Sequence, residues 1–341
     1  MTQELISLLA SAMSFAITAA LGKKVIPWLH KLKYGQTIKE IGPKWHEKKQ
    51  GTPTMGGIMF IAGILISLIV CLPLYYYLRS GGSIASSYED TKSYWVRLIA
   101  GVLMAVMFAA VGFLDDYIKV VKKQNDGLTP GQKMIFMTLI SGAFLATLAI
   151  SGDATVTTIP FFSSEVDVGF WFYPVSLIMI VGFVNAVNLT DGIDGLCSSV
   201  TFFVAIVFIV IAGMHSMFGM SIFAAAVAGG CLGFLVWNFF PAKVFMGDTG
   251  SLFLGGLFCA LAYGVNMPIL IPLVGIIYLC EAGSVMLQVA YFKATHGKRI
   301  FKMSPIHHHF EMSGWSEVKI VWVFSIVTLI AGVIAVALSI A

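Results

Sequence analysis

The chain has very few charged residues. Only 11% of its 341 residues are Asp, Glu, Lys or Arg, whereas 58% are hydrophobic. A soluble domain carries about 25% charged residues, so a soluble protein of this composition would have too little polar surface to face water. This lack of charge excludes an ordinary soluble helical protein and indicates a chain that lies largely within a lipid bilayer.

Cysteine is also scarce, and no domain linker, low-complexity tract or inverted repeat is evident. The five cysteines lie inside apolar stretches and lack the spacing of metal ligands, so we interpret them as packing residues: Cys71, Cys197, Cys231, Cys259 and Cys280. A disulfide framework and a zinc site are thereby excluded. We expect residues 1–341 to form a single integral membrane domain.

Long apolar runs are what the sequence has in abundance. Runs of roughly 17–25 residues are long enough to cross a bilayer as helices. We therefore predict an all-α polytopic membrane protein with about ten transmembrane helices. The predicted spans are 4–22, 54–78, 96–114, 133–151, 172–188, 196–214, 218–238, 251–265, 268–292 and 318–340.

Positive charge is distributed unevenly between the loops. All but three of the 21 Lys and Arg residues lie in 23–53, 115–133, 239–250 and 293–319. Basic loops face the cytoplasm, so these loops are predicted to be cytoplasmic and both termini extracytoplasmic. The first apolar run has no basic residue before it and no small-residue cleavage site, so we expect a retained span and not a signal peptide.

Five aspartates fall at the cytoplasmic ends of apolar segments: Asp115, Asp116, Asp191, Asp194 and Asp248. Carboxylates near hydrocarbon are costly and by default mark a functional site. Clustered carboxylates with access to water usually hold a hard cation such as Mg²⁺. Neighbouring side chains in a helix point about 100° apart, so Asp115 and Asp116 are expected to share one site only if their helix ends there.

The stretch from Asn185 to Asp194 has a polar group every three residues, with Asn188 and Asp191 between them. A straight helix would place its two ends on opposite faces. Asp-Gly pairs favour turns, and Gly192 follows Asp191 directly. The pattern predicts a bent loop whose amides and carboxylates face a ligand.

Three further features carry polar chemistry. GTPTMGG and MGDTGS each precede an apolar run, where helix amides attract phosphate, and Thr52 or Thr54 could cap the first of these helices. Three consecutive histidines in PIHHHFE diverge and chelate one ion poorly, so contacts to phosphate and sugar oxygens fit better. Glu281 is the only acid deep in a predicted span. It could line the active-site cavity or pair with another side chain inside the bundle, and the sequence leaves both open. The acids of the outer loops, Glu89 among them, are expected to be solvated.

Together these motifs resemble the bacterial phospho-N-acetylmuramoyl-pentapeptide transferase family (MraY), part of the polyprenyl-phosphate N-acetylhexosamine-1-phosphate transferases. GTPTMGG, LDDYIK, NAVNLTDGIDGL, MGDTGSLFLGG and PIHHHFEMSGWSE stand in the family's order over nearly the whole chain. PIHHHFE separates this branch from related transferases that use UDP-GlcNAc. Phe183-Val184 departs from the small polar residues expected before Asn185.

The resemblance implies a ten-helix enzyme of the bacterial inner membrane with a cytoplasmic active site. Such an enzyme transfers phospho-MurNAc-pentapeptide from UDP-MurNAc-pentapeptide to undecaprenyl phosphate, giving lipid I and UMP, and it requires Mg²⁺. A homodimer is consistent with the family, and no nucleic acid is expected to bind. The alternatives are a UDP-GlcNAc transferase and, in a different class, an ion-coupled transporter.

The resemblance also implies roles for individual residues. Asp248 is expected to be the main Mg²⁺ ligand, with Asp115, Asp116 and Asp191 as further candidates, and Asp115 and Asp116 form the expected catalytic pair. Direct attack and a covalent aspartyl intermediate are both open. Phe245 is expected to stack on uracil. The expected substrate-binding residues are Lys49, Thr52, Lys119, Lys123, Lys133, Asn185, Asn188, Asp191, Gly192, Asp194, Asn238, Phe245, His307, His308 and His309.

Overall fold

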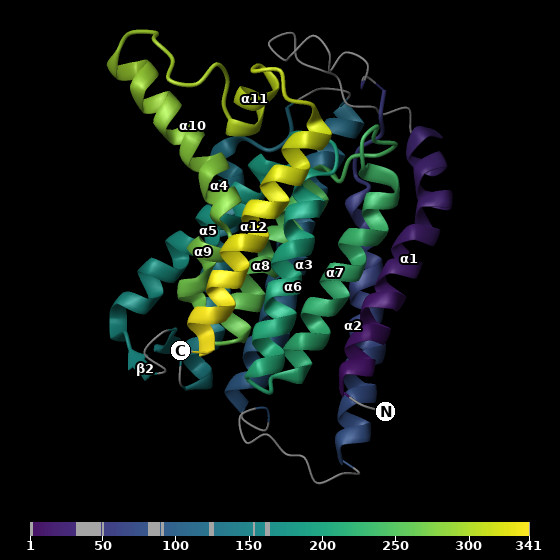
Figure 1. Ribbon diagram of the computed structural model, residues 1–341, viewed down its shortest axis with the longest axis vertical. Coiled ribbons are helices and arrows are strands. Elements are labelled where there is room, and N and C mark those ends of the chain that lie inside the picture. The colour runs from purple at the N-terminus through teal and green to yellow at the C-terminus, as the bar shows by residue number, and fades with distance from the viewer. Residues whose placement is uncertain are drawn as a thin grey trace.

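The computed structural model describes residues 3–31, 49, 51–80, 89, 92–122, 126–152, 154–160 and 164–340, and these are almost entirely helical (Figure 1). The helices are α1 (Gln3–Lys31), α2 (Gly57–Ser80), α3 (Lys92–Lys122), α4 (Pro130–Ser151), α5 (Phe172–Thr190), α6 (Leu196–Met214), α7 (Phe218–Asn238), α8 (Gly247–Gly264), α9 (Ile271–Val274), α10 (Ile276–Ala294), α11 (Ile306–Glu311) and α12 (Glu317–Ile340). Two strands, β1 (Val156–Ile159) and β2 (Ser164–Asp167), form one antiparallel hairpin.

Eight of the described helices are long and apolar enough to cross a membrane, namely α1 to α7 and α12. The segments Pro268–Val274 and Ile276–Ala294 together make a ninth span that is bent by 73°. The prediction of a helical multi-pass membrane protein is therefore confirmed. The count of ten stays a prediction, because α8 would be the tenth span and its first turn carries the polar residues Asp248, Thr249 and Ser251.

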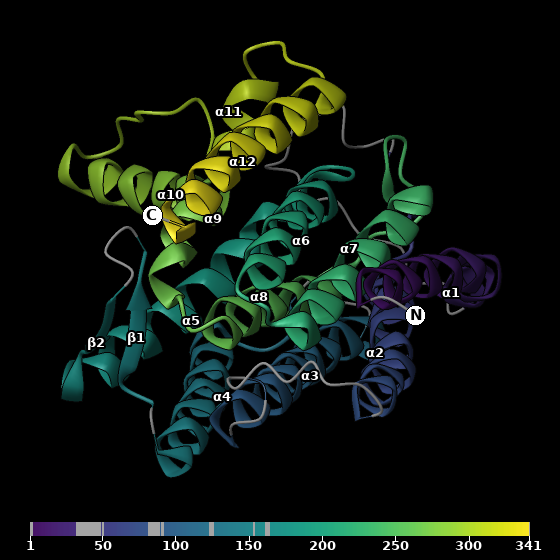
Figure 2. The same ribbon diagram turned by 60° about the horizontal axis from the view of Figure 1, so that its bottom comes forward.

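Helix α8 lies in the middle of the bundle (Figure 2). All its residues from Thr249 to Gly264 are buried, and α2, α3, α5, α6 and α7 pack around it. Because protein and not lipid surrounds it, this helix can carry polar residues at its start if other helices supply their hydrogen-bond partners. The centre of the fold therefore accepts a charged helix end.

Glycines allow α3 and α8 to approach closely. A methyl group on Gly112 would lie 2.1 Å from the carbonyl oxygen of Asp248, and one on Gly256 would lie 2.7 Å from the Cα atom of Ala105. Small residues at such crossings let two backbones pack in direct contact within a membrane protein. The contact brings the last turns of α3 against the first turn of α8.

The polar motifs gather at one end of the bundle, and the two termini lie toward the other (Figure 1). The motif end contains the last turns of α3 and α5, the first turn of α8, and α11. This arrangement agrees with the topology predicted from the basic loops. Which side of a membrane each end faces stays a prediction.

Two predictions about acidic residues are wrong. Helix α3 does not end at Asp115 and Asp116 but continues to Lys122. An oxygen of each still lies within 4.8 Å of an oxygen of Asp248, so sharing one site does not require the helix to end there. Glu89 is not solvated: its side chain is buried and accepts hydrogen bonds from the Tyr75 hydroxyl at 2.8 Å and the Gly219 amide at 3.0 Å. It thereby satisfies a free amide at the start of α7.

The contact between α3 and α8 can be tested with a methyl group. We expect Gly112→Ala to lower the melting temperature of the purified protein, because overpacking against a backbone atom costs about 1–3 kcal/mol. Gly142→Ala is the matched control, since the space beside Gly142 in α4 is open. Thermal unfolding in detergent measures both variants, and equal melting temperatures would contradict the proposed close packing.

Candidate active site

Two aspartates from different helices share the same pair of lysines. Lys119 Nζ lies 2.5 Å from Asp115 Oδ2 and 3.2 Å from Asp248 Oδ2. Lys133 Nζ lies 3.1 Å from Asp115 Oδ2 and 2.5 Å from Asp248 Oδ2. These four side chains, which we call the carboxylate–lysine cluster, join α3, α4 and α8 at the motif end of the bundle.

Local sequence explains where Lys133 lies. Thr129 caps α4 in a capping box with Gln132, and Pro130 occupies the first turn. These residues fix the start of the helix just before Lys133. The amide of Leu128 donates to Asp115 Oδ1 at 2.7 Å, so the same aspartate that receives the lysine also anchors the entry to α4.

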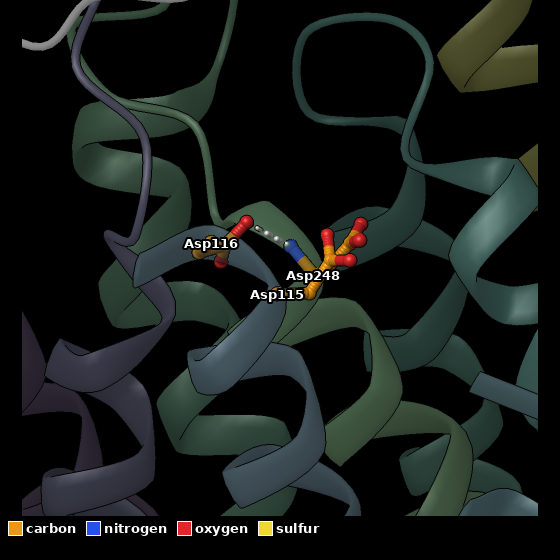
Figure 3. A group of neighbouring side chains, drawn as sticks. All are labelled: Asp115, Asp116 and Asp248. Carbon is orange, nitrogen blue, oxygen red and sulfur yellow. Dashed lines mark hydrogen bonds between the residues drawn. The ribbon is translucent and has the colours of Figure 1, made fainter. Parts of the chain in front are cut away.

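Asp116 contacts backbone and not the lysines. Its Oδ1 accepts from the Asp248 amide at 3.2 Å (Figure 3). Its Oδ2 accepts from the Thr249 amide at 2.9 Å and the Thr249 hydroxyl at 2.6 Å. A carboxylate at a helix N-terminus satisfies free amides and interacts favourably with the helix dipole. Asp116 therefore holds α8 in the position that presents the Asp248 side chain to the cluster.

The three aspartates fit a divalent cation. One carboxylate oxygen each of Asp115, Asp116 and Asp248 lies within 4.8 Å of the other two. Hard cations such as Mg²⁺ take carboxylate oxygens as ligands. The ammonium groups of Lys119 and Lys133 lie between Asp115 and Asp248, which shows that this position attracts positive charge.

The predicted bend after α5 is confirmed. Helix α5 ends at Thr190, Gly195 has a left-handed φ of 76°, and α6 begins at Leu196. Before the bend, Asn188 Nδ2 donates to Asp248 Oδ1 at 2.9 Å and to Ser251 Oγ at 2.8 Å. Asn185 is exposed one turn earlier.

Asp191 lies in the bend beside the cluster and is partly buried. Burial raises the pKa of its carboxyl to about 8, and the negative charges of Asp248, Asp116 and Asp194 act in the same direction. A carboxyl with this pKa is largely protonated at neutral pH while no added cation is bound. Asp191 therefore adds little negative charge to the site in that state.

A second ionic group, separate from the carboxylate–lysine cluster, consists of Lys49, Asp194 and Glu317. Lys49 Nζ is 2.7 Å from Asp194 Oδ1 and 2.7 Å from Glu317 Oε2. Asp194 Oδ2 accepts from the Ala242 amide at 2.8 Å. Asn238 Oδ1 accepts from the Gly195 amide at 3.2 Å, so this group fixes the bend against the segment that follows α7.

A cavity of about 570 Å³ opens beside this ionic group. Its lining consists of Lys49, Thr52, Asp194, Phe240, Pro241, Ala242, Glu311, Gly314, Trp315, Ser316 and Glu317. The aromatic rings of this cavity are therefore Phe240 and Trp315, and the structure does not place Phe245 in its lining. The expected stacking of uracil on Phe245 gains no support from the cavity.

The two glycine amides at the start of α2 are not free for phosphate. The Gly56 amide donates to the Phe245 carbonyl at 2.8 Å, and the Gly57 amide donates to the Met246 carbonyl at 3.0 Å. Helix α2 begins at Gly57, so neither Thr52 nor Thr54 caps it. These hydrogen bonds hold the start of α2 against residues Phe245 and Met246, which precede α8.

The three histidines have different hydrogen-bond partners, but they do not all diverge, because the ring centroids of His307 and His308 are 4.1 Å apart. His307 Nδ1 lies 2.9 Å from Glu281 Oε2, and His308 Nδ1 lies 2.6 Å from Glu311 Oε2. His309 Nδ1 accepts from the Lys302 amide at 3.1 Å, which gives it a role in the loop before α11. Glu281 thus pairs with a buried side chain inside the bundle, which is one of the two alternatives that the sequence left open.

Sequence reasoning did not find several of these partners. Glu317, Glu311 and Thr249 contact predicted site residues from positions that carry no unusual local pattern. All three lie inside quoted motifs, Glu311 and Glu317 in PIHHHFEMSGWSE and Thr249 in MGDTGSLFLGG. Lys123, which was expected to contact phosphate, lies outside the described residues.

Comparison with known proteins adds independent information. Residues 98–266 match the family model for glycosyl transferase family 4, and residues 49–61 match phospho-N-acetylmuramoyl-pentapeptide-transferase signature 1. A phospho-N-acetylmuramoyl-pentapeptide-transferase of Clostridium perfringens (strain SM101 / Type A) is 47% identical over 322 residues, 94% of this chain and 93% of that protein. The corresponding protein of Listeria monocytogenes serotype 4b (strain CLIP80459) is 47% identical over 325 residues, 95% of each chain.

The raised pKa of Asp191 predicts a dependence of stability on pH. The folded protein keeps the Asp191 proton up to about pH 8, whereas the unfolded chain releases it near the ordinary value of 3.8. The folded state binds more protons within this range, so the free energy of unfolding falls as pH rises through it. Between about pH 6 and pH 8, metal-free wild type should lose roughly 2 kcal/mol more than Asp191→Asn, which has no proton to release. Melting temperatures measured in chelator at both pH values check this, and parallel changes in the two proteins would contradict it.

Proposed function

The chain belongs to the phospho-N-acetylmuramoyl-pentapeptide-transferase family, and we propose that it transfers phospho-MurNAc-pentapeptide from UDP-MurNAc-pentapeptide to undecaprenyl phosphate. The products are lipid I and UMP. The observation that carries the proposal is the carboxylate–lysine cluster, because it combines a cation site with two phosphate-binding ammonium groups at one end of a membrane bundle.

The proposed reaction exchanges one phosphoanhydride for another. An oxygen of the lipid phosphate forms a bond to the phosphorus attached to the sugar, and the bond from that phosphorus to the UMP oxygen breaks. Because a similar bond is formed and broken, the reaction needs little driving force. Catalysis then depends on neutralising the charge of the diphosphate and on placing the acceptor in line with the leaving group.

Charges of both signs in the cluster suit this task. Lys119 and Lys133 can leave Asp115 and Asp248 to contact phosphate oxygens, since each lysine is about a quarter exposed, 26% and 24%. Asp248, with Asp115, would hold Mg²⁺, which when bound supplies positive charge to the diphosphate. Asp116 would keep its hydrogen bonds to the start of α8. Asn188 keeps the Asp248 carboxylate aimed at the cluster through its hydrogen bond to Oδ1.

The hydrogen bonding of the aspartates favours direct attack by the lipid phosphate. Both oxygens of Asp116 accept from the start of α8, and Asp115 accepts from Leu128 and pairs with both lysines. A covalent intermediate would require one of these carboxylates to give up its partners and act as the nucleophile. In our proposal no carboxylate attacks phosphorus: Asp115 helps to hold the cation, and Lys119 and Lys133 contact the acceptor phosphate.

The location of the cluster suits two substrates of different solubility. It lies at the end of the bundle, where a lipid phosphate from the membrane and a nucleotide from water can both arrive (Figure 1). The cavity beside Lys49 and Asp194 is our candidate for part of the nucleotide side. We place this end in the cytoplasm and the protein in the bacterial inner membrane, on the basis of the basic loops.

A transporter is the less favoured alternative. Carriers that use intramembrane carboxylates place them near the middle of the bilayer at the interface of repeats. Here Asp115, Asp116 and Asp248 lie together at one end of the bundle, and the deeper acid, Glu281, is paired with His307. This distribution supports chemistry at a membrane surface.

The transferase assay tests the proposal directly. Purified protein should release UMP from UDP-MurNAc-pentapeptide only when undecaprenyl phosphate and Mg²⁺ are both present, and UDP-GlcNAc should not replace the donor. Asp248→Asn should lower kcat on the order of 10²–10³-fold, because it removes a charge that acts on the diphosphate. Asp167→Asn, the same change in an exposed hairpin residue, should retain activity. Absence of UMP release by wild type would refute the function, and full activity of Asp248→Asn would remove that residue from the site.

Isotope exchange separates direct attack from a covalent intermediate. After the lipid acceptor has been removed, labelled UMP should not enter UDP-MurNAc-pentapeptide, because direct attack cannot run in reverse without lipid I. An aspartyl intermediate would instead allow exchange with donor and enzyme alone. Exchange at a rate close to turnover would therefore contradict our assignment of Asp115.

A further inference from the structure

A buried carboxylate and imidazole connect α10 to α11 beside the bend after α5. The side chains of Glu281 and His307 are both 0% exposed, and Oε2 of Glu281 lies 2.9 Å from Nδ1 of His307. Among the described residues, Oε1 of Glu281 has no hydrogen-bond partner. The imidazole is therefore the side chain that compensates this carboxylate.

The other nitrogen of the ring points toward the site. A methyl group on Gly192 would lie 2.2 Å from Nε2 of His307, so this nitrogen lies directly against the bend between Asp191 and Asp194. In the described part of the chain, Nε2 is buried and has no hydrogen-bond partner. Buried polar atoms without partners are rare in native proteins, and such an atom commonly meets a ligand or an ion.

The carboxylate fixes the orientation of the ring through its contact with Nδ1. This orientation leaves Nε2 on the side of the bend between Asp191 and Asp194. A ring nitrogen that carries a hydrogen can donate to an anionic oxygen.

We propose that Glu281 is a positioning residue that holds His307 so that Nε2 donates a hydrogen bond to a phosphate oxygen of the nucleotide-sugar donor at Gly192. This inference rests on the proposed function. It assigns Gly192 a specific part, because a methyl group there would lie 2.2 Å from Nε2 and displace the ring. It also gives His307 and His308 different roles, because the partner of His308 is Glu311, which lines the cavity.

The inference predicts how variants of the pair combine. Glu281→Leu removes the acceptor and the charge, and we expect kcat to fall on the order of 10²-fold, as when one preorganised donor is lost. Glu281→Gln should retain more activity, because its amide oxygen still accepts from Nδ1. The double variant Glu281→Leu/His307→Ala should be no less active than His307→Ala alone, since residues that act through one another are not additive.

Matched controls come from the same region of the chain. Cys280→Ser changes the exposed neighbour of Glu281, and Gly283→Ala adds a methyl group to open space on α10; both should retain activity. Gly192→Ala should lower kcat as Glu281→Leu does. Multiplication of the two single effects in the double variant, or activity of Glu281→Leu within about twofold of wild type, would overturn the inference.

A spectroscopic measurement tests the pair independently of turnover. Nitrogen-15 labelled histidine should show two carboxylate-bonded Nδ1 protons, one of His307 and one of His308. The His307 signal should be present in wild type and Gly192→Ala and lost in Glu281→Leu and His307→Ala. Its absence from wild type would refute the pair even if the transferase assay succeeds. If wild type shows this signal but releases no UMP, the Glu281–His307 pair stands. The proposed function is then refuted, and so is the contact between His307 and a phosphate oxygen.

Discussion

The contact between the Asp116 carboxylate and the start of α8 is the interaction on which the site depends. Helix α8 begins inside the protein, so its first amides need an acceptor, and Asp116 supplies both of its oxygens to Asp248 and Thr249. The absence of a side chain at Gly112 lets α3 come close enough to make this contact. Once α8 is held there, Asp248 faces Asp115 across the two lysines, and the charges needed for phosphate chemistry lie together.

Much of the architecture follows from local sequence. Apolar run length gives the helices, and the distribution of Lys and Arg groups the polar motifs at one end of the bundle. The bend after α5 follows from the Asp-Gly pair at Asp191 and Gly192, because such pairs favour turns, whereas Asn185, which was expected to converge with Asp194, is exposed on α5. Helix α8 is an exception to the rule that apolar run length identifies the spans. Other helices enclose it, so its first turn can be polar, and these polar residues lower its mean hydropathy.

Pairings between distant residues could not be predicted in this way. Glu281 and His307 are 26 positions apart, and the amide of Asp194 bonds to Glu317 over 123 positions. A local pattern of hydrophobic and polar residues contains no information about which distant helix supplies a partner. For the same reason Glu89 was expected in water, although residues of α2 and α7 enclose it. The motifs identified the regions of the site, and the packing of helices assigned the contacts within them.

The most direct test of the central claim is an experimental structure of the protein with Mn²⁺, whose anomalous scattering locates the ion. The account predicts one ion bound by Asp248 and Asp115, with Asp116 still bonded to the first amides of α8 and the two lysines moved from the position they share. An ion bound elsewhere, with Lys119 and Lys133 still between Asp115 and Asp248, would contradict it.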